Sequence, residues 1–226
     1  MAVTLVFNPF GLYGIDIILE CFGVLAAVLI SIIGYKAYKL TKERRFFYFS
    51  LAFVFITLSF IARALTAAVV LGQVGAVAGT PSAALTLSGL ESIFDLGRFV
   101  YFGLVFAAYL ILLALSMRIY DKKLLGLLSI FMALFAFSAF DSLPIMFYLV
   151  SFVLLAFIAW NYRANYHEKK TKAAFLASFA FCILTLEPVF FIAGLVMKEL
   201  SIGAYVVRLI AYVTLLLMLV KVYSKK

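Results

Sequence analysis

The sequence predicts an all-α integral membrane protein, a seven-transmembrane helix bundle with its N-terminus outside and its C-terminus in the cytoplasm. Composition predicts the class, because 67% of the 226 residues are hydrophobic and only 13% are charged, whereas a soluble domain is about half apolar and about a quarter charged. Run length predicts the architecture, because a bilayer core needs about 20 apolar residues per helix and seven runs of the chain approach or exceed that length.

The seven runs are expected to form a single domain over residues 1–226. They cover residues 12–40, 46–71, 92–117, 124–140, 143–162, 173–197 and 204–223. The fourth run is short, and only Asp141 and Ser142 separate it from the fifth, so we expect these two helices to form a tight hairpin. Six helices are the alternative, if that pair is re-entrant.

The longest connection between the runs, residues 72–91, is rich in Gly, Ala, Ser and Thr. Thr80 followed by Pro81 is typical of a helix start, with a capping hydroxyl and then a proline at the first helical position. The connection therefore predicts a short external helix over the mouth of the bundle, with a mobile loop as the alternative.

Basic residues in the connections predict the orientation. They gather in the first, third and fifth connections and in the tail: Lys36, Lys39, Lys42, Arg44 and Arg45; Arg118, Lys122 and Lys123; Arg163, Lys169, Lys170 and Lys172; and Lys221, Lys225 and Lys226. The opposite side holds only Lys198 between the last two helices. Cytoplasmic loops carry an excess of Lys and Arg. We therefore expect a multi-pass protein of the plasma membrane, with these three connections and the tail on the cytoplasmic side.

The same residues explain the formal net charge of +9. Basic residues that set membrane topology also contact anionic lipid, so the charge needs no other partner. We therefore expect the lipid bilayer as a partner and no nucleic acid.

Ionisable residues inside the predicted helices lie close to the outer side. In this orientation the outer third to half of the membrane contains Glu20, Arg63, Asp95, Arg98, Glu187 and Arg208, and the inner halves contain no comparable group. An isolated charge in hydrocarbon costs several kcal/mol and normally faces the bundle interior or a water-filled cavity. Arginine also forms two-pronged pairs with carboxylates. We therefore expect the six groups to converge on one polar site open to the outside.

Neighbouring residues favour an inward face for this site. Tyr205 and Tyr212 share a helix face with Arg208, because they lie three residues before it and four residues after it. Pro188 follows Glu187 and has no N–H for the carbonyl of Leu184, so a kink is expected at the depth of the site. Structural pairing of helices, an external ligand pocket and an ion or proton route remain open as roles for the charges.

Several kinds of chemistry are absent from the sequence. The single histidine, His167, lies outside the predicted spans, which excludes haem ligation, a zinc-hydrolase site and a Ser–His pair inside the membrane. Cys21 and Cys182 lie in apolar runs and are expected to be buried. The chain is therefore predicted to be neither an enzyme nor a metal protein. Retinal is rejected as a cofactor, because the last helix has only Lys221, at its cytoplasmic end.

One segment carries a family resemblance. GYKAYKLTKERRFFYFSLAFVFITLSFIARAL, residues 34–65, has a YxAYxxT run, a basic turn and then F-x-x-L-x-F before a charge in the outer half. It resembles the first two helices of prokaryotic, often archaeal, seven-helix membrane modules, some of which are the sensor halves of histidine kinases. The resemblance implies a sensory or scaffold role. Kinase-linked members continue into a cytoplasmic domain, whereas this chain stops at Lys226, so a separate protein partner is expected.

These observations lead to one functional hypothesis and two alternatives. The hypothesis is a sensor-like or accessory membrane protein with an outward-facing pocket for a small charged ligand. Arg63, Arg98 and Arg208 would hold anionic groups, the carboxylates would hold cationic groups or position the arginines, and the two tyrosines would line the wall. The alternatives are a small-molecule or ion-coupled transporter and a structural subunit of a membrane complex.

Overall fold

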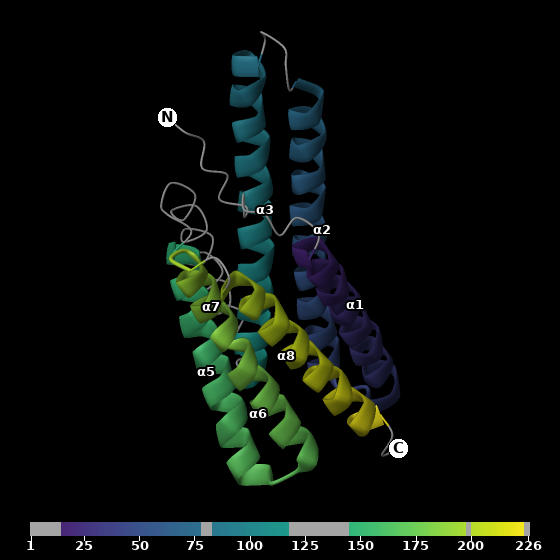
Figure 1. Cartoon of the computed structure of the whole chain (residues 1–226). Helices are drawn as coiled ribbons and strands as arrows, with labels where there is room; N and C mark the ends of the chain where they lie inside the picture. The colour runs from purple at the N-terminus through teal and green to yellow at the C-terminus, as the bar shows by residue number, and fades with distance from the viewer. Residues whose placement is uncertain (1–14, 78–82, 118–144, 198–199, 224–226) are drawn as a thin grey trace.

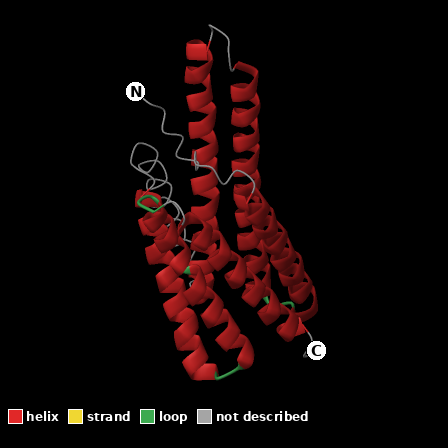
Figure 2. Cartoon of the chain, viewed as in Figure 1, coloured by secondary structure: helices red, strands yellow, loops and turns green. Residues whose placement is uncertain are grey.

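The computed structural model describes the chain except for residues 1–14, 78–82, 118–144, 198–199 and 224–226. The described part is helical, with no strand (Figure 2). In chain order its helices are α1 (Ile15–Thr41), α2 (Arg44–Val77), α3 (Ala83–Met117), α5 (Ile145–Lys169), α6 (Lys172–Leu184), α7 (Leu186–Gly194) and α8 (Leu200–Tyr223) (Figure 1).

The described helices make the chain a multi-pass membrane protein. Six stretches are long and apolar enough to cross a bilayer: Cys21–Thr41, Arg44–Thr66, Asp95–Met117, Ile145–Lys169, Lys172–Gly194 and Leu200–Val222. α6 and α7 together supply one of them. The predicted helix over residues 124–140 lies outside the described residues, so the seventh span stays a prediction.

Two neighbouring helices of the bundle run in the same direction. Near the start of α5, the ring of Phe147 stacks on that of Phe102 of α3 with 3.9 Å between centroids. Near the end of α5, the Asn161 amide donates to the hydroxyl of Ser116 at 3.4 Å, close to the end of α3. The end of α3 and the start of α5 therefore lie at opposite ends of the bundle, as the seven-helix prediction requires.

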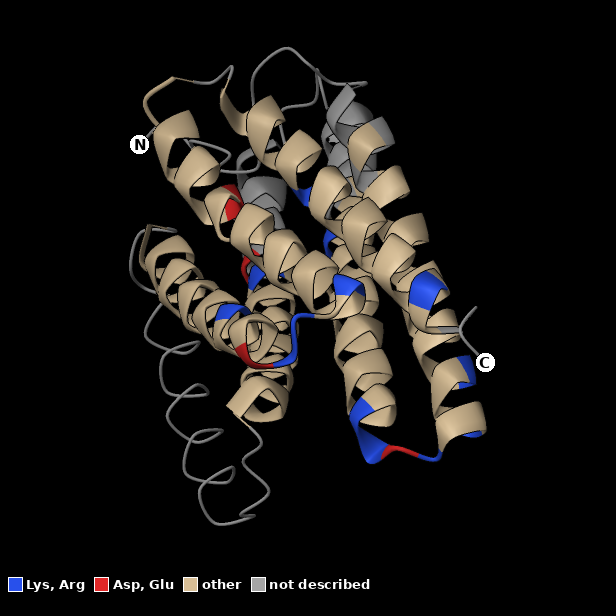
Figure 3. Cartoon of the chain, turned by 90° about the horizontal axis from the view of Figure 1, so that it is seen from below, with Lys and Arg blue, Asp and Glu red and all other residues tan. Residues whose placement is uncertain are grey.

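Basic side chains mark one end of the bundle. The α1–α2 turn and the α5–α6 turn both lie there, with the end of α8, because residues of all these segments line one cavity. In Figure 3 the blue of Lys and Arg marks these turns and helix ends. We call this the basic end and the opposite one the far end. The grouping agrees with the predicted pattern of connections, and which side of the membrane it faces stays a prediction.

Small residues bring helices α1, α2 and α3 close together. Ser31 and Ser50 bond reciprocally between α1 and α2, and the Ser50 hydroxyl donates to the Ser31 carbonyl at 2.8 Å. A Cβ placed on Gly34 would lie 3.3 Å from the Ser50 Cβ. Between α2 and α3, a Cβ placed on Gly97 would overlap the Thr66 side chain. These contacts have the small-residue character that lets membrane helices pack closely.

Large apolar side chains cover the outside of the bundle. Trp160 is 73% exposed, and Leu25, Phe157 and Leu217 are each at least half exposed. Such a surface suits hydrocarbon, in which exposed apolar groups carry no penalty. Cys21 and Cys182 are exposed as well, so the prediction that they are buried is wrong. A thiol is apolar enough to face lipid, and an apolar run does not distinguish a lipid-facing position from a core position.

The prediction for residues 72–91 is also corrected. α2 continues to Val77 and α3 already begins at Ala83, so most of the expected connection is helical, although Thr80 and Pro81 lie outside the described residues. The 34 residues of α2 span about 51 Å at 1.5 Å each, against a hydrocarbon core of about 30 Å. The end of α2 contains no proline, and its Gly72 and Gly75 weaken a helix without ending it. Figure 1 shows α2 and α3 extending beyond the other helices.

Candidate functional site

A buried ion pair joins α7 to α8 in the far half of the bundle. Arg208 is 3% exposed and Glu187 is 6% exposed. The Arg208 Nε donates to Glu187 Oε1 at 2.8 Å, and its Nη2 donates to the same oxygen. Both charges are therefore compensated inside the bundle, as an ion pair within a membrane requires.

A helix break places Glu187 at this position. α6 ends at Leu184 and α7 begins at Leu186, with Thr185 between them. Pro188 has no N–H to donate to the Leu184 carbonyl, and the Phe181 carbonyl accepts from both the backbone N–H of Thr185 at 3.0 Å and its hydroxyl at 2.7 Å. Glu187 lies in the first turn of α7, where the positive end of the helix dipole favours a carboxylate. The kink expected beside Glu187 is thus present as an interruption of the span.

Aromatic rings surround the Arg208 guanidinium. Its central carbon lies 4.6 Å from the ring centroid of Phe60 on α2, 5.5 Å from that of Tyr205 and 5.6 Å from that of Phe191 on α7. A guanidinium within about 6 Å of an aromatic face gains cation–π stabilisation, which is larger when water is excluded. The sequence pattern identified Tyr205 but neither phenylalanine, because face-sharing along one helix does not reveal the neighbouring helices.

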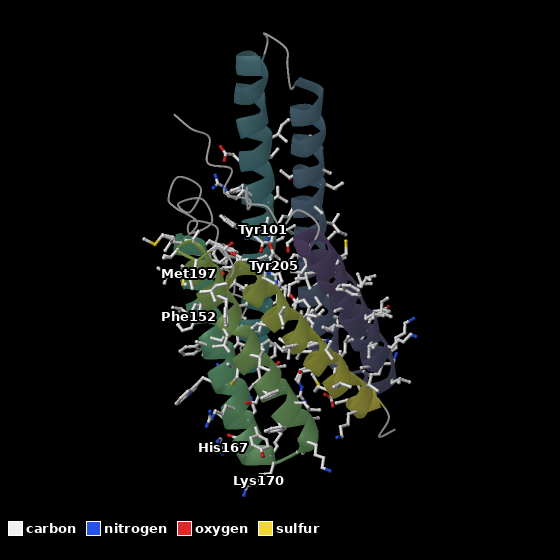
Figure 4. The ribbon with its side chains drawn as sticks, in the orientation of Figure 1. Tyr101, Phe152, His167, Lys170, Met197 and Tyr205 are labelled. Carbon is white, nitrogen blue, oxygen red and sulfur yellow. The ribbon has the colours of Figure 1, made fainter. Side chains whose placement is uncertain are left out.

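Tyr205 connects a second arginine to the same cluster. The Nη2 of Arg63 on α2 donates to the Tyr205 hydroxyl at 2.8 Å. The Arg63 guanidinium carbon lies 5.5 Å from the Tyr101 ring and 6.0 Å from the Tyr205 ring, and Figure 4 marks both tyrosines in the middle of the bundle. We call Arg63, Glu187, Tyr205 and Arg208 the ionic cluster, which draws on helices α2, α7 and α8.

One donor of the cluster has no hydrogen-bond partner in the described part of the chain. The Arg208 Nη1 is buried and bonds to no atom of the described residues. Buried polar groups in proteins are almost always hydrogen-bonded, to protein, water or a ligand. The spare edge of Arg208 is therefore the point where the cluster can accept an oxygen from a small molecule.

The other predicted site residues differ in their placement. Asp95 accepts a bond from Arg98 at 2.6 Å, one turn along α3. Tyr212 is buried, and its ring packs edge-on against Phe53 with 5.8 Å between centroids. The structure thus brings together Arg63, Glu187, Tyr205 and Arg208.

Glu20 lies in the first turns of α1, but only its backbone is among the described parts of the structure. The same holds for Glu91 on α3. The expected convergence of Glu20 on the site therefore stays a prediction. Across the described ranges, no three His, Cys, Asp or Glu side chains are grouped as a metal ion would need.

Comparison with known proteins assigns no family. No family model, no curated protein and no solved structure matches the chain. The resemblance of residues 34–65 to prokaryotic seven-helix modules stays a prediction, and the functional argument depends on the geometry of the ionic cluster.

Proposed function

We propose that the chain is a sensor-like membrane protein whose ionic cluster binds a small anion, such as a carboxylate or an oxyanion. The unpartnered, buried Nη1 of Arg208 supports this proposal most directly. A guanidinium presents its donors in a rigid fork that suits planar carboxylates and oxyanions. Here Glu187 uses one edge of that fork, and the other edge is left for the ligand.

The cluster is placed so that binding alters two helices. An anion on Nη1 would share the positive charge of Arg208 with Glu187 and weaken the bond that joins α8 to α7. Glu187 lies directly after the break at Thr185, where Pro188 cannot donate a helical hydrogen bond and the span resists a change in angle less. α6 and α8 both reach the basic end, so a change at the cluster would reach the surface that faces a protein partner.

The experiment measures thermal unfolding of the purified protein in a neutral detergent with phosphate, sulfate, acetate or succinate, against chloride at equal ionic strength. We expect at least one anion to stabilise the wild type saturably. At a hundredfold excess over Kd the gain is about 2.7 kcal/mol, which corresponds to a rise in Tm of about 5–10 °C for a chain of this size. Arg208→Lys keeps the charge but removes the fork, so the rise should disappear.

Two hydroxyl deletions provide the comparison within one helix. Tyr205→Phe removes the hydroxyl that accepts from Arg63 and should weaken the anion effect. Thr214→Val removes a hydroxyl further along α8, which donates to the Ile210 carbonyl, and should leave the effect unchanged. An equal rise in Arg208→Lys, or no rise above chloride in the wild type, would contradict the proposal and leave the cluster as a structural link between helices.

The broken span favours a transporter as the second candidate. Many transporters bind substrate where a membrane helix is interrupted near the midplane and a half-helix end faces the substrate. α6 and α7 divide one span into 13 and 9 residues. Uptake of a radiolabelled anion by proteoliposomes discriminates between the two candidates, because saturable flux requires a carrier and a sensor gives none.

A further inference from the structure

A second site lies at the basic end, away from the ionic cluster. An open cavity of about 260 Å³ lies there, lined by the start of α2, the ends of α3, α5 and α8, and the start of α6. Five helices therefore meet around it. None of its lining residues belongs to the ionic cluster, so the proposed anion sensing does not account for it.

The mouth of the cavity is polar and basic. Arg45 and Lys169 line it together with Glu43 and Thr171, and all four are exposed to the surrounding medium. Glu43 accepts a bond from Arg45 at 3.1 Å, with both side chains about half exposed, so this carboxylate compensates one of the two bases. Among the described residues, the charged lining keeps an excess of one positive charge and favours an anionic group.

The deeper part of the cavity is apolar. Phe49, Ala177, Met218 and Leu219 line it and are each less than one-tenth exposed. Pockets that enclose a whole small molecule measure about 300–1,000 Å³, so this cavity can enclose only part of a lipid. A ligand that fits both parts has an anionic head at the mouth and an apolar chain that enters between the helices.

We propose that this cavity binds an anionic phospholipid of the membrane leaflet at the basic end. Arg45 and Lys169 hold the phosphate, and the end of one acyl chain fills the space between Ala177 and Met218. The remaining chain lies on the exposed apolar flank of the bundle, where Phe175 and Leu217 are about half exposed. Basic pockets between membrane helices at the cytoplasmic level bind anionic head groups for the same physical reason.

The test uses the full chain in neutral-detergent micelles and measures Tm against added phosphatidylglycerol. Phosphatidylcholine serves as the zwitterionic lipid and glycerol 3-phosphate as the head group without chains. We expect phosphatidylglycerol alone to raise Tm saturably. Each basic residue near a membrane surface contributes about 1 kcal/mol toward anionic lipid, so Arg45→Gln with Lys169→Gln should weaken the apparent affinity about 30-fold.

A matched variant controls for loss of charge. Lys36→Gln with Arg163→Gln also removes one lysine and one arginine, both exposed and both absent from the cavity lining, and should change the affinity less than threefold. Ala177→Leu fills the deep part and should reduce binding with every charge intact.

Three outcomes would overturn the proposal. The first is an equal loss of affinity in the two double variants, which would indicate general attraction to the basic end. The second is full stabilisation by glycerol 3-phosphate, which would indicate a site for a soluble phosphate. The third is unchanged lipid affinity in both Ala177→Leu and the Arg45 and Lys169 double variant.

Discussion

The same pair of residue types has two different environments in this molecule. Arg208 and Glu187 are almost fully buried, whereas Arg45 and Glu43 are about half exposed at the basic end. Solvent screens the exposed pair, so its contribution to stability is small. Solvent screens the buried pair far less, and each charge depends on the other for its compensation.

This difference predicts unequal stability effects. Glu187→Gln leaves the Arg208 charge buried and unpaired, and should lower the free energy of unfolding by about 3–5 kcal/mol. Glu43→Gln makes the identical chemical change at the surface and should cost less than about 1 kcal/mol. Reversible unfolding in mixed micelles measures both values, and equal costs would show that the cluster is as solvated as the surface.

The sequence predicted part of the cluster at the residue scale. Arg208, Glu187 and Tyr205 followed from the rule that charges within a membrane face inward and from their positions along each helix. Phe60 and Tyr101 did not, because the relative rotation of two helices depends on the packing of all their neighbours. Asp95 pairs with Arg98 one turn away on the same helix, and its place at the common site stays a prediction.

Helices were easier to predict than their ends. Six predicted runs overlap the six spans, because about 20 apolar residues in succession have few alternatives to a membrane helix. The ends of α2 and α3 differ from prediction because hydropathy marks the apolar span and not the residue at which the backbone leaves the helix, and α2 continues through Gly72 and Gly75. The break between α6 and α7 was predictable from Pro188, whose missing N–H acts on its own helix and needs no knowledge of the neighbours.

Close packing of α3 on α2 gives a prediction at the element scale. A Cβ at Gly97 would overlap Thr66, including its Cβ, so rotation of the threonine does not remove the overlap and the helices must separate. Gly97→Ala should lower the free energy of unfolding by about 1–3 kcal/mol, in the range of overpacked cores. Thermal or denaturant unfolding of the purified protein measures this change.

Gly103 supplies the control on the same helix. A Cβ placed there meets no atom within 4 Å. Gly103→Ala should therefore be neutral or raise stability by up to about 1 kcal/mol, because alanine favours a helix more than glycine does. Equal effects of the two substitutions would refute a close α2–α3 contact.

The whole molecule has two chemically different ends. Basic turns and an open, partly apolar cavity lie at one end, and the ionic cluster lies toward the other. α8 connects them directly, because Arg208 lies in its first half and Met218 and Leu219 line the cavity near its end. The account of function depends on the far end facing the outside, which the distribution of Lys and Arg predicts.

Labelling of single cysteines in intact cells tests this orientation most directly. In a background with Cys21→Ala and Cys182→Ala, Val196→Cys places a thiol after α7 at the far end, where the side chain is 87% exposed, and Lys170→Cys places one in the α5–α6 turn. We predict that a membrane-impermeant maleimide labels the Val196 position in intact cells and the Lys170 position only after lysis. The opposite pattern would place the ionic cluster toward the cytoplasm and contradict the proposed sensing of an external anion.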